Sequence, residues 1–242
     1  IRVVNLSYGT LSRNDADYDT LAWAAMALWR TGVVVVASTG NDGDSVVGLA
    51  SPAYSPWIIA VGAQDTKGTA TYSDDSVPSF SERAANGQRG PDLVAPGVGV
   101  VSLGVKGSNL YESYGSARVG NGFLRGSGTS QAAAVVSGAV ALMFQRAPWA
   151  QPDDIKGTLL ANSTRLNGVD QAAQGQGALD LRRVLNAGTG RYWYQLPGTG
   201  NGSGPIENTR GGQNLTMDGV ALTGERDIFG LAWSSSNMAN AV

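Results

Sequence analysis

Two residue types that carry much of protein chemistry are absent from this sequence, because its 242 residues include no histidine and no cysteine. Without cysteine, the chain forms no disulfide bond and offers no thiolate as a nucleophile or metal ligand. Without histidine, it lacks the side chain that most often acts as a general base near neutral pH. Proton transfer at such a pH therefore depends on other groups or on other polypeptide.

Charge and long apolar runs are scarce as well. Charged residues make up 15% of the chain and sum to a net charge of −2, whereas about 25% is usual. A surface so sparsely and evenly charged excludes nucleic acid as an expected partner. No apolar run approaches the ~20 residues of a membrane-spanning helix, so no membrane span is expected.

Glycine, in contrast, is abundant, and strand and helix patterns alternate along the first part of the chain. There are 34 glycines, about twice the usual share. Residues 1–7 and the valine run at 33–36 indicate strands, and apolar residues at helical spacing over 15–30 separate them. Unbroken apolar runs, as at 33–36 and 57–63, suit strands that are buried on both faces in a parallel sheet. This alternation of strand and helix patterns predicts an α/β fold in which helices flank a parallel sheet.

The remaining elements follow from turn signals and periodicity. We expect short strands at 92–95 and 98–103, a long loop at 107–120, and helices at 129–146, 151–164 and 177–187. From residue 188 the chain becomes rich in Gly, Asn and Ser, so residues 188–242 are interpreted as a linker and C-terminal extension. Within it, residues 211–230 predict a hairpin.

The chain begins directly in an apolar strand, without an initiator methionine. We therefore expect it to be a segment of a longer precursor. The strand at 33–36 needs more sheet and helix around it to be buried on both faces. We expect the chain to fold only together with an N-terminal segment.

A serine stands where a glycine-rich turn meets a helix, in "GSGTSQAAAVVSG" at 126–138. The free N–H groups and positive dipole end of a helix favour the negative charge that develops during acyl transfer. Ser130 is thus a candidate nucleophile, although a serine hydroxyl reacts poorly until a base takes its proton. The alternative is that Thr129 or Ser130 simply caps the helix.

Two further stretches follow predicted strands. Ligands bind at strand ends in parallel sheets, and "STGNDG" at 38–43 places Asn41 there, as an amide donor that could stabilise an oxyanion. The alternative is a turn asparagine in the left-handed conformation. The stretch "SYG" at 7–9 offers backbone that could pair with an extended peptide.

Five blocks occur in order: "VVNLSYG", "VVVVASTGNDG", "SPAYSPWIIAVGAQD", "PDLVAPG" and "GTSQAAAVVSGAVALM". Together they closely resemble the second half of the catalytic domain of the subtilisin-like serine peptidases, the subtilases. The resemblance covers residues 1–187. It implies a partial subtilisin-like three-layer fold without the N-terminal part that bears the catalytic Asp and His.

The resemblance also implies roles for individual residues. It makes Ser130 the nucleophile and Asn41 the oxyanion-hole donor, and it places a cis peptide bond before Pro52. The pocket for the residue before the scissile bond would have two walls: Ser7, Tyr8 and Gly9 on one side, and Ser38, Thr39 and Gly40 on the other.

The sequence departs from the family pattern at a few positions. Ala134 replaces a usual proline and Val135 a frequent histidine, which affects the helix start and not the nucleophile. Asp42, beside Asn41, brings a negative charge near the pocket and hints at tolerance for basic or polar side chains.

In subtilases the triad runs Asp, His, Ser along the chain, so the lack of histidine fits a missing N-terminal part. We expect a secreted or cell-surface bacterial serine endopeptidase that hydrolyses peptide or protein substrates through Ser130. Its Asp and His would come from an N-terminal segment of the same precursor, so the chain alone is expected to be inactive or nearly so. No cofactor or metal ligand is expected, and structural calcium is not readable from the sequence.

Two other interpretations stay open. The chain could be a non-catalytic structural or assembly protein on a subtilase scaffold, which the residues preceding Ile1 would decide. An unrelated α/β-hydrolase is a weaker alternative, because "GTSQA" at 128–132 is not the Gly-x-Ser-x-Gly elbow.

Overall fold

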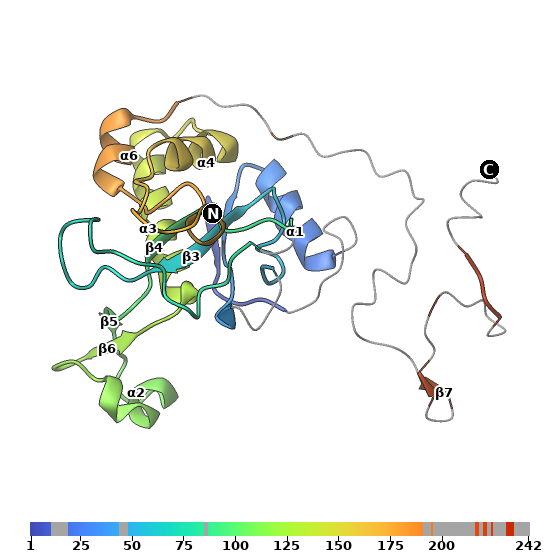
Figure 1. The fold of residues 1–242 in the computed structure, drawn as a ribbon, viewed down its shortest axis with the longest axis horizontal. Coiled ribbons are helices and arrows are strands. Elements are labelled where there is room, and N and C mark those ends of the chain that lie inside the picture. The colour runs from blue at the N-terminus through green and yellow to red at the C-terminus, as the bar shows by residue number, and fades with distance from the viewer. Residues whose placement is uncertain are drawn as a thin grey trace.

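A parallel four-stranded sheet forms the centre of the molecule, in the strand order β1-β2-β3-β4 (Figure 1). In the computed structural model, the described residues are 1–10, 19–43, 48–84, 87–190, 195, 216–217, 220–221, 224 and 231–234. The strands are β1 (Val3–Leu6), β2 (Val34–Ser38), β3 (Ile59–Gln64) and β4 (Leu93–Pro96). The α/β class with a parallel sheet and helices is therefore confirmed.

Strand β2 lies inside the sheet and all five of its residues are buried. It pairs with β1 on one side and β3 on the other, with Val36 opposite Asn5 and Ile59. The strand thus has both of its faces covered, as its composition predicts. The covering elements belong to this chain, so the expectation that its burial needs additional sheet and helix is wrong.

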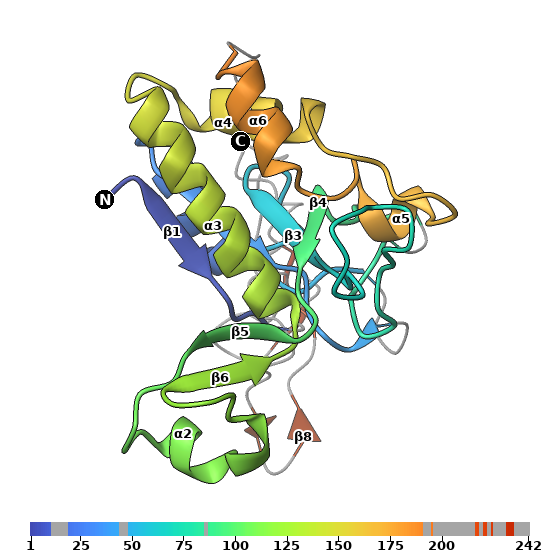
Figure 2. The same cartoon turned by 90° about the vertical axis from the view of Figure 1, so that its left-hand side faces the viewer.

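Helix α3 (Thr129–Arg146) lies across the sheet and contacts all four strands (Figure 2). The side chains that it buries are mostly small and recur at helical spacing, which lets the helix axis approach the strands closely. They include Ala132, Ala133, Val136, Ala139 and Val140. Its bounds are those predicted from the sequence.

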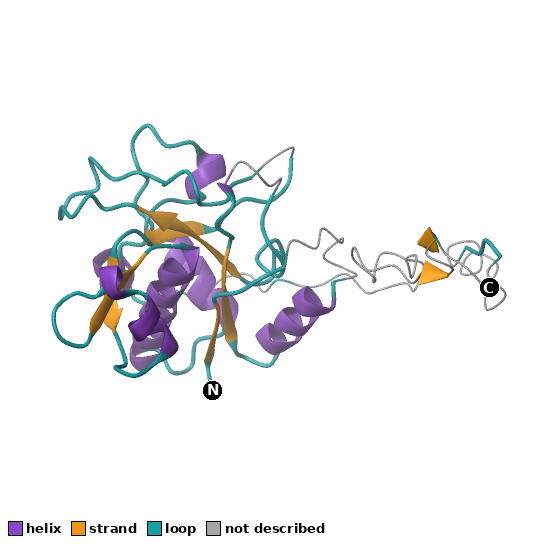
Figure 3. Cartoon of the chain, turned by 90° about the horizontal axis from the view of Figure 1, so that it is seen from below, coloured by secondary structure: helices purple, strands orange, loops and turns teal. Residues whose placement is uncertain are grey.

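Other helices pack around this centre (Figure 3). Helix α1 (Thr20–Arg30) begins at Asp19, whose carboxylate accepts hydrogen bonds from the N–H groups of Leu21 and Ala22. The predicted start of this helix at 15–18 falls outside the described residues. Helices α4 (Pro152–Ala161), α5 (Gln171–Gln174) and α6 (Leu181–Ala187) follow α3.

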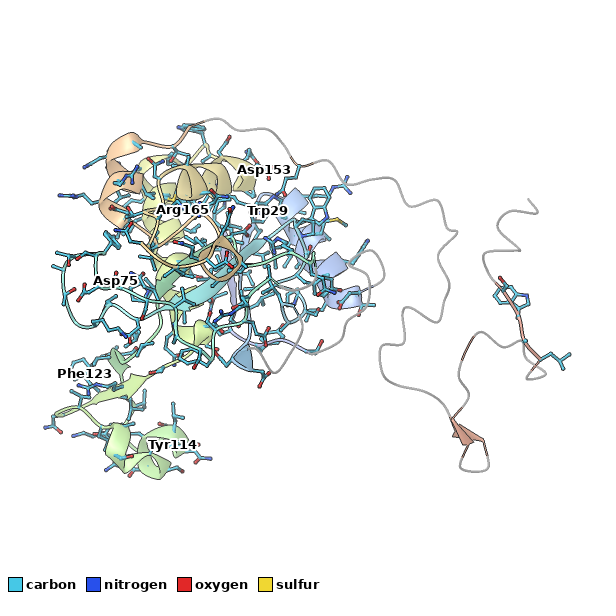
Figure 4. The ribbon with its side chains drawn as sticks, viewed as in Figure 1. Trp29, Asp75, Tyr114, Phe123, Asp153 and Arg165 are labelled. Atoms are coloured by element: carbon cyan, nitrogen blue, oxygen red, sulfur yellow. The ribbon has the colours of Figure 1, made fainter. Side chains whose placement is uncertain are left out.

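The indole of Trp29 ties α1 to α4. Its Nε1–H donates to Asp153 Oδ1 over 2.9 Å (Figure 4). Both side chains are buried, so this hydrogen bond satisfies polar groups that would otherwise be costly to bury.

Residues 107–120 are not the long loop that the sequence predicts. Strands β5 (Val100–Leu103) and β6 (Phe123–Gly126) form an antiparallel hairpin. Helix α2 (Asn109–Ser113) and the short 3₁₀ helix η2 (Gly115–Ala117) lie between them. Ser108 caps α2 by accepting the N–H of Tyr111, whose ring is buried. Burial of this one aromatic residue supports a helix too short to show periodicity.

Further along the chain, β7 (Thr216–Met217) pairs antiparallel with β8 (Val220–Ala221), within the predicted hairpin region. No helix among the described residues has the length and apolar character needed to cross a bilayer. The peptide bond between Ser51 and Pro52 is cis, as the resemblance implies.

Lys156 of α4 is a buried cation. Its Nζ donates to the carbonyls of Pro56 (2.6 Å) and Ile58 (2.9 Å) and lies 3.6 Å from Asp92 Oδ2. Burial lowers the pKa of Lys156 to about 8, although the Asp92 carboxylate acts in the opposite direction. Protonated Lys156 is therefore less stable in the folded protein than in water.

We predict that this lysine makes stability depend on alkaline pH. Between pH 8 and 10.5, the folded and unfolded values of its pKa, the unfolded chain binds more protons, so the free energy of unfolding rises with pH. The gain is about 3 kcal/mol over this window. Urea unfolding of the full-length protein and of Lys156→Met at several pH values measures the free energy of unfolding. Its rise with pH should disappear in the variant.

Lys106→Met is the matched control, because Lys106 is exposed and its removal should leave the slope in place. An equal slope in the wild type and in Lys156→Met would contradict the prediction.

Candidate active site

Ser130 is the second residue of α3 and does not cap it. Gly128 precedes the helix with φ +153°, and no side chain caps the helix start. The Ser130 hydroxyl donates to the carbonyl of Ser7 (3.3 Å), and the Ser7 hydroxyl donates to the carbonyl of Ser130 (2.9 Å). These reciprocal hydrogen bonds hold the start of α3 against the end of β1, and the capping alternative does not apply.

Thr129 joins the same helix start to the end of β2. Its N–H donates to Asn41 Oδ1 over 2.8 Å, and its Oγ1 accepts the N–H of Gly40 over 3.3 Å. Its hydroxyl also lies within donating distance of Gly40 O (3.2 Å) and Asn41 Oδ1 (3.1 Å). Thr129 is completely buried, whereas Asn41 is exposed, so these bonds are partly shielded from water.

The same contacts orient the Asn41 amide. Because Oδ1 accepts from Thr129, the NH₂ group of Asn41 is left to donate elsewhere. Asn41 is exposed, so this donor can reach a ligand. Outside glycine, Lys67 is the one described residue with positive φ, so the left-handed turn interpretation of Asn41 is wrong.

A third segment lies between the ends of β1 and β2. Ala50 N–H donates to the carbonyl of Thr39 (2.9 Å), and Ser51 exchanges two backbone hydrogen bonds with Thr10 (2.9 and 3.1 Å). A Cβ on Gly9 would lie 2.6 Å from the carbonyl oxygen of Ser51. The backbone at 50–51 therefore connects the two predicted walls.

The structure brings together all eight residues that the sequence predicts for the site. They lie on three segments: 7–9 after β1, 38–41 at and after the end of β2, and 130 at the start of α3. Tyr8 is 58% exposed. Ser38 is buried, and its hydroxyl lies 3.5 Å from the carbonyl of Leu6.

The sequence does not predict three further residues that contact the site: Thr129, Ala50 and Glu82. Its pattern offers Thr129 only as a cap, although the place of this residue between Gly128 and Ser130 marks it as part of the same block. Ala50 and Glu82 carry no local signal. Glu82 is completely buried, and its Oε2 (3.0 Å) shares the N–H of Ala50 with the Thr39 carbonyl (2.9 Å).

A cavity of about 450 Å³ lies elsewhere, on another side of α3. Tyr72, Pro96 and Val135 are among its lining residues, and none of the eight predicted site residues lines it. Among the described residues, no group of three or more acidic side chains is placed to hold a metal ion.

The sequence profile of the subtilase family matches residues 1–178. This chain belongs to the subtilase family. As a subtilase it is a serine-protease-like protein.

Among related sequences, serine protease AprX of Bacillus subtilis (strain 168) is 35% identical over 189 residues, which cover 76% of this subtilase and 43% of AprX. The membrane-bound transcription factor site-1 protease of Homo sapiens is 34% identical over 194 residues, 77% of this chain and 17% of that protein. The chain thus spans less than half the length of these relatives.

Solved structures agree with the fold. Fervidolysin from Fervidobacterium pennivorans, a keratinolytic enzyme related to subtilisin, matches with a TM-score of 0.63 and 29% identity over 78% of this chain and 27% of that chain. The prenylagaramide maturation protease PagA matches with a TM-score of 0.57 and 28% identity over 76% of this chain and 61% of that chain.

We predict that Gly40→Ala disrupts the site. Gly40 has φ +118°, and a Cβ there would lie 2.2 Å from the carboxyl group of Glu82. Alanine therefore adds a steric clash to a backbone strain of about 1–3 kcal/mol. Urea unfolding of the full-length protein should show that Gly40→Ala lowers the free energy of unfolding by much more than the backbone strain alone.

Gly107→Ala is the matched control. Gly107 has φ +82°, and a Cβ there would have no atom within 4 Å of it, so this variant should lose only about 1–3 kcal/mol. Equal losses in the two variants would show that contact with Glu82 is unimportant.

Proposed function

We propose that this subtilase is the nucleophile-bearing part of a serine endopeptidase, which hydrolyses peptide bonds in peptides or proteins by acyl transfer through Ser130. The main support is the contact between α3 and the end of β2. The Thr129 N–H bonds Asn41 Oδ1 at 2.8 Å, which sets the Asn41 amide beside the residue that precedes Ser130. A nucleophile and an oxyanion donor on adjoining segments are what acyl transfer requires.

The oxyanion would be held by two donors. One is the NH₂ group of Asn41, whose orientation follows from the Thr129 contact. The other is the N–H of Ser130, because the first N–H groups of an α-helix have no acceptor within the helix. The helix dipole favours negative charge at the same place.

The general base would come from a separate N-terminal segment that carries Asp and His. The chain has no histidine, and none of its three lysines approaches Ser130 in a described hydrogen bond or ion pair. In the described sheet, β1 pairs only with β2, so its other edge can accept a further strand. A histidine positioned from that segment would take the Ser130 proton and later protonate the leaving amine, before water releases the acyl group.

The walls proposed for the residue before the scissile bond are Ser7, Tyr8 and Gly9 on one side and Ser38, Thr39 and Gly40 on the other. Their placement on both sides of the 50–51 backbone supports this assignment. We also propose a secreted or cell-surface bacterial protein, in keeping with the lack of cysteine. Residues 188–242 would then be an extension beyond the catalytic domain.

We predict that a fluorophosphonate probe labels Ser130 in the full-length protein. The base supplied by the N-terminal segment raises the nucleophilicity of the hydroxyl, so labelling should be abolished in Ser130→Ala. Intact mass spectrometry and peptide mapping measure the adduct.

Ser137→Ala is the control, since Ser137 lies further along α3 and its hydroxyl bonds Asn5 and the Ala133 carbonyl. Residues 1–242 alone should be labelled little or not at all. A full-length protein that resists the probe would support the non-catalytic scaffold instead.

We predict that Asn41→Asp lowers kcat by about 10²–10³-fold, the loss found in subtilisin when an oxyanion-hole donor is removed. Aspartate keeps the acceptor for the Thr129 N–H but lacks the donor. Steady-state hydrolysis of a peptide substrate measures kcat, and thermal unfolding should show a fold that is largely preserved. A kcat near that of the wild type would exclude Asn41 from the oxyanion hole.

A further inference from the structure

An open cavity of about 620 Å³ lies between the end of β6 and the segment around the short helix η2. Residues 125–127 form one of its sides and residues 116–120 form the other. Its volume is in the range of pockets that bind small ligands. The mechanism proposed above makes no use of this cavity.

The cavity adjoins the turn that carries the nucleophile, because β6 leads directly into the start of α3 (Figure 2). Ser127, in its lining, precedes Ser130 by three residues, so their Cα atoms are at most about 11 Å apart. Ser127 Oγ accepts the N–H of Gly99 (2.9 Å), and the Gly128 N–H donates to the Gly97 carbonyl (2.8 Å). These bonds hold the turn against the chain that follows β4.

The cavity and the two proposed walls lie on different sides of the oxyanion donor. The walls follow β1 and β2, whereas the turn beside the cavity is bonded to the chain after β4, at the other edge of the sheet. Asn41 marks the boundary, because it follows β2 and its Oδ1 accepts the N–H of Thr129. A peptide whose residue before the scissile bond lies between the walls therefore directs the residues after that bond toward the cavity.

The described lining of the cavity contains two arginines and no acidic residue. One of them, Arg118, already has partners within the chain. Its Nη2 lies 2.8 Å from Glu112 Oε2, and its guanidinium lies over the Tyr111 ring, 4.4 Å from the centroid. Arg118 therefore shapes the cavity, while the Glu112 carboxylate compensates its charge.

The second arginine, Arg125, has no such partner. It is exposed, and within the part of the chain that the structure describes no group forms a hydrogen bond or ion pair with it. Its stem passes Gly99, where a Cβ would lie 3.9 Å from the Arg125 Cδ. A guanidinium is always charged in proteins and can bind a carboxylate through two parallel hydrogen bonds. The cavity thus offers one uncompensated positive charge of a shape that fits a carboxylate.

We infer, on the basis of the proposed function, that this cavity binds an acidic side chain of the substrate at one of the first three positions after the scissile bond, and that Arg125 supplies the selecting charge. An extended peptide advances about 3.3 Å per residue, so three residues cover the distance from Ser130 to Ser127. Arg125 binds the substrate, and the bond-breaking steps remain with Ser130 and Asn41. The substrate class is peptides with Asp or Glu on the leaving-group side.

The test starts from a peptide that the full-length protein cleaves and makes pairs that differ only by aspartate or asparagine at the first, second or third position after the bond. Asparagine has nearly the same size as aspartate and lacks its charge. At one of these positions kcat/KM should be about 3–5-fold higher for aspartate, the size expected of an ion pair in contact with water. Arg125→Gln should bring this ratio close to one, whereas Arg125→Lys retains the charge and should keep part of the preference.

Arg146→Gln is the matched control. Arg146 is also exposed and lies at the other end of α3, about 24 Å from Ser130 along the helix, so this variant should keep the wild-type ratio. The ratio cancels any loss that is common to both peptides of a pair. Because salt screens exposed charges, the wild-type ratio should fall toward one in 1 M salt.

Three results would overturn the inference: a wild-type ratio near one at all three positions, a preference that Arg125→Gln leaves intact, or a preference for aspartate found only before the scissile bond. In each case continued cleavage of the asparagine peptides, together with fluorophosphonate labelling of Ser130, would leave the proposed function standing. If the full-length protein cleaves no peptide and Ser130 resists the fluorophosphonate, the proposed function fails and this inference fails with it.

Discussion

The site depends on the contact of Thr129 with the end of β2. Thr129 and Asn41 are 88 residues apart in the chain, so their hydrogen bond forms only when α3 lies on the sheet. The threonine hydroxyl accepts from Gly40 N–H and can donate to only one of the two oxygens near it. One buried side chain therefore sets the distance between the helix start and the strand end, and with it the relative position of Ser130 and Asn41.

Glycine makes this close approach available. Gly128 and Gly40 both have positive φ, where other residues are strained. A Cβ on Gly128 would also lie only 2.9 Å from Gln131 Oε1, whereas its distance of 3.5 Å from Asn41 Oδ1 would be an ordinary contact. The high glycine content of the chain thus has a structural use at the point where α3 and β2 meet.

Local sequence pattern is enough for the elements that are long or strongly apolar. The valine run predicts a doubly buried strand, and spacing predicts α3 at 129–146, because these signals come from the residues themselves. Helix α2 gives no such signal, because what stabilises it is the burial of Tyr111 in the folded protein. Composition also does not decide whether Ser130 caps a helix. The structure decides it, because Gly128 is the residue that precedes the helix. Pairing Ser130 with Asn41 from sequence requires the ordered motifs of the family.

Glu82 cannot be found from sequence for a related reason: its importance comes from what it touches. The segment 50–58 shows the same principle on a larger scale. Glu82 takes a backbone N–H at Ala50, while Lys156 and Arg89 donate to backbone carbonyls at 53–58. The acid thus accepts one N–H group and the bases donate to carbonyls, as the polarity of each group requires. A segment without regular secondary structure is held in this way by buried charges, and hydrogen bonds to charged groups are stronger than neutral ones. This explains how a loop can link two strand ends: its backbone is held by the side chains of Glu82 and Arg89, from the connection between β3 and β4, and of Lys156 in α4.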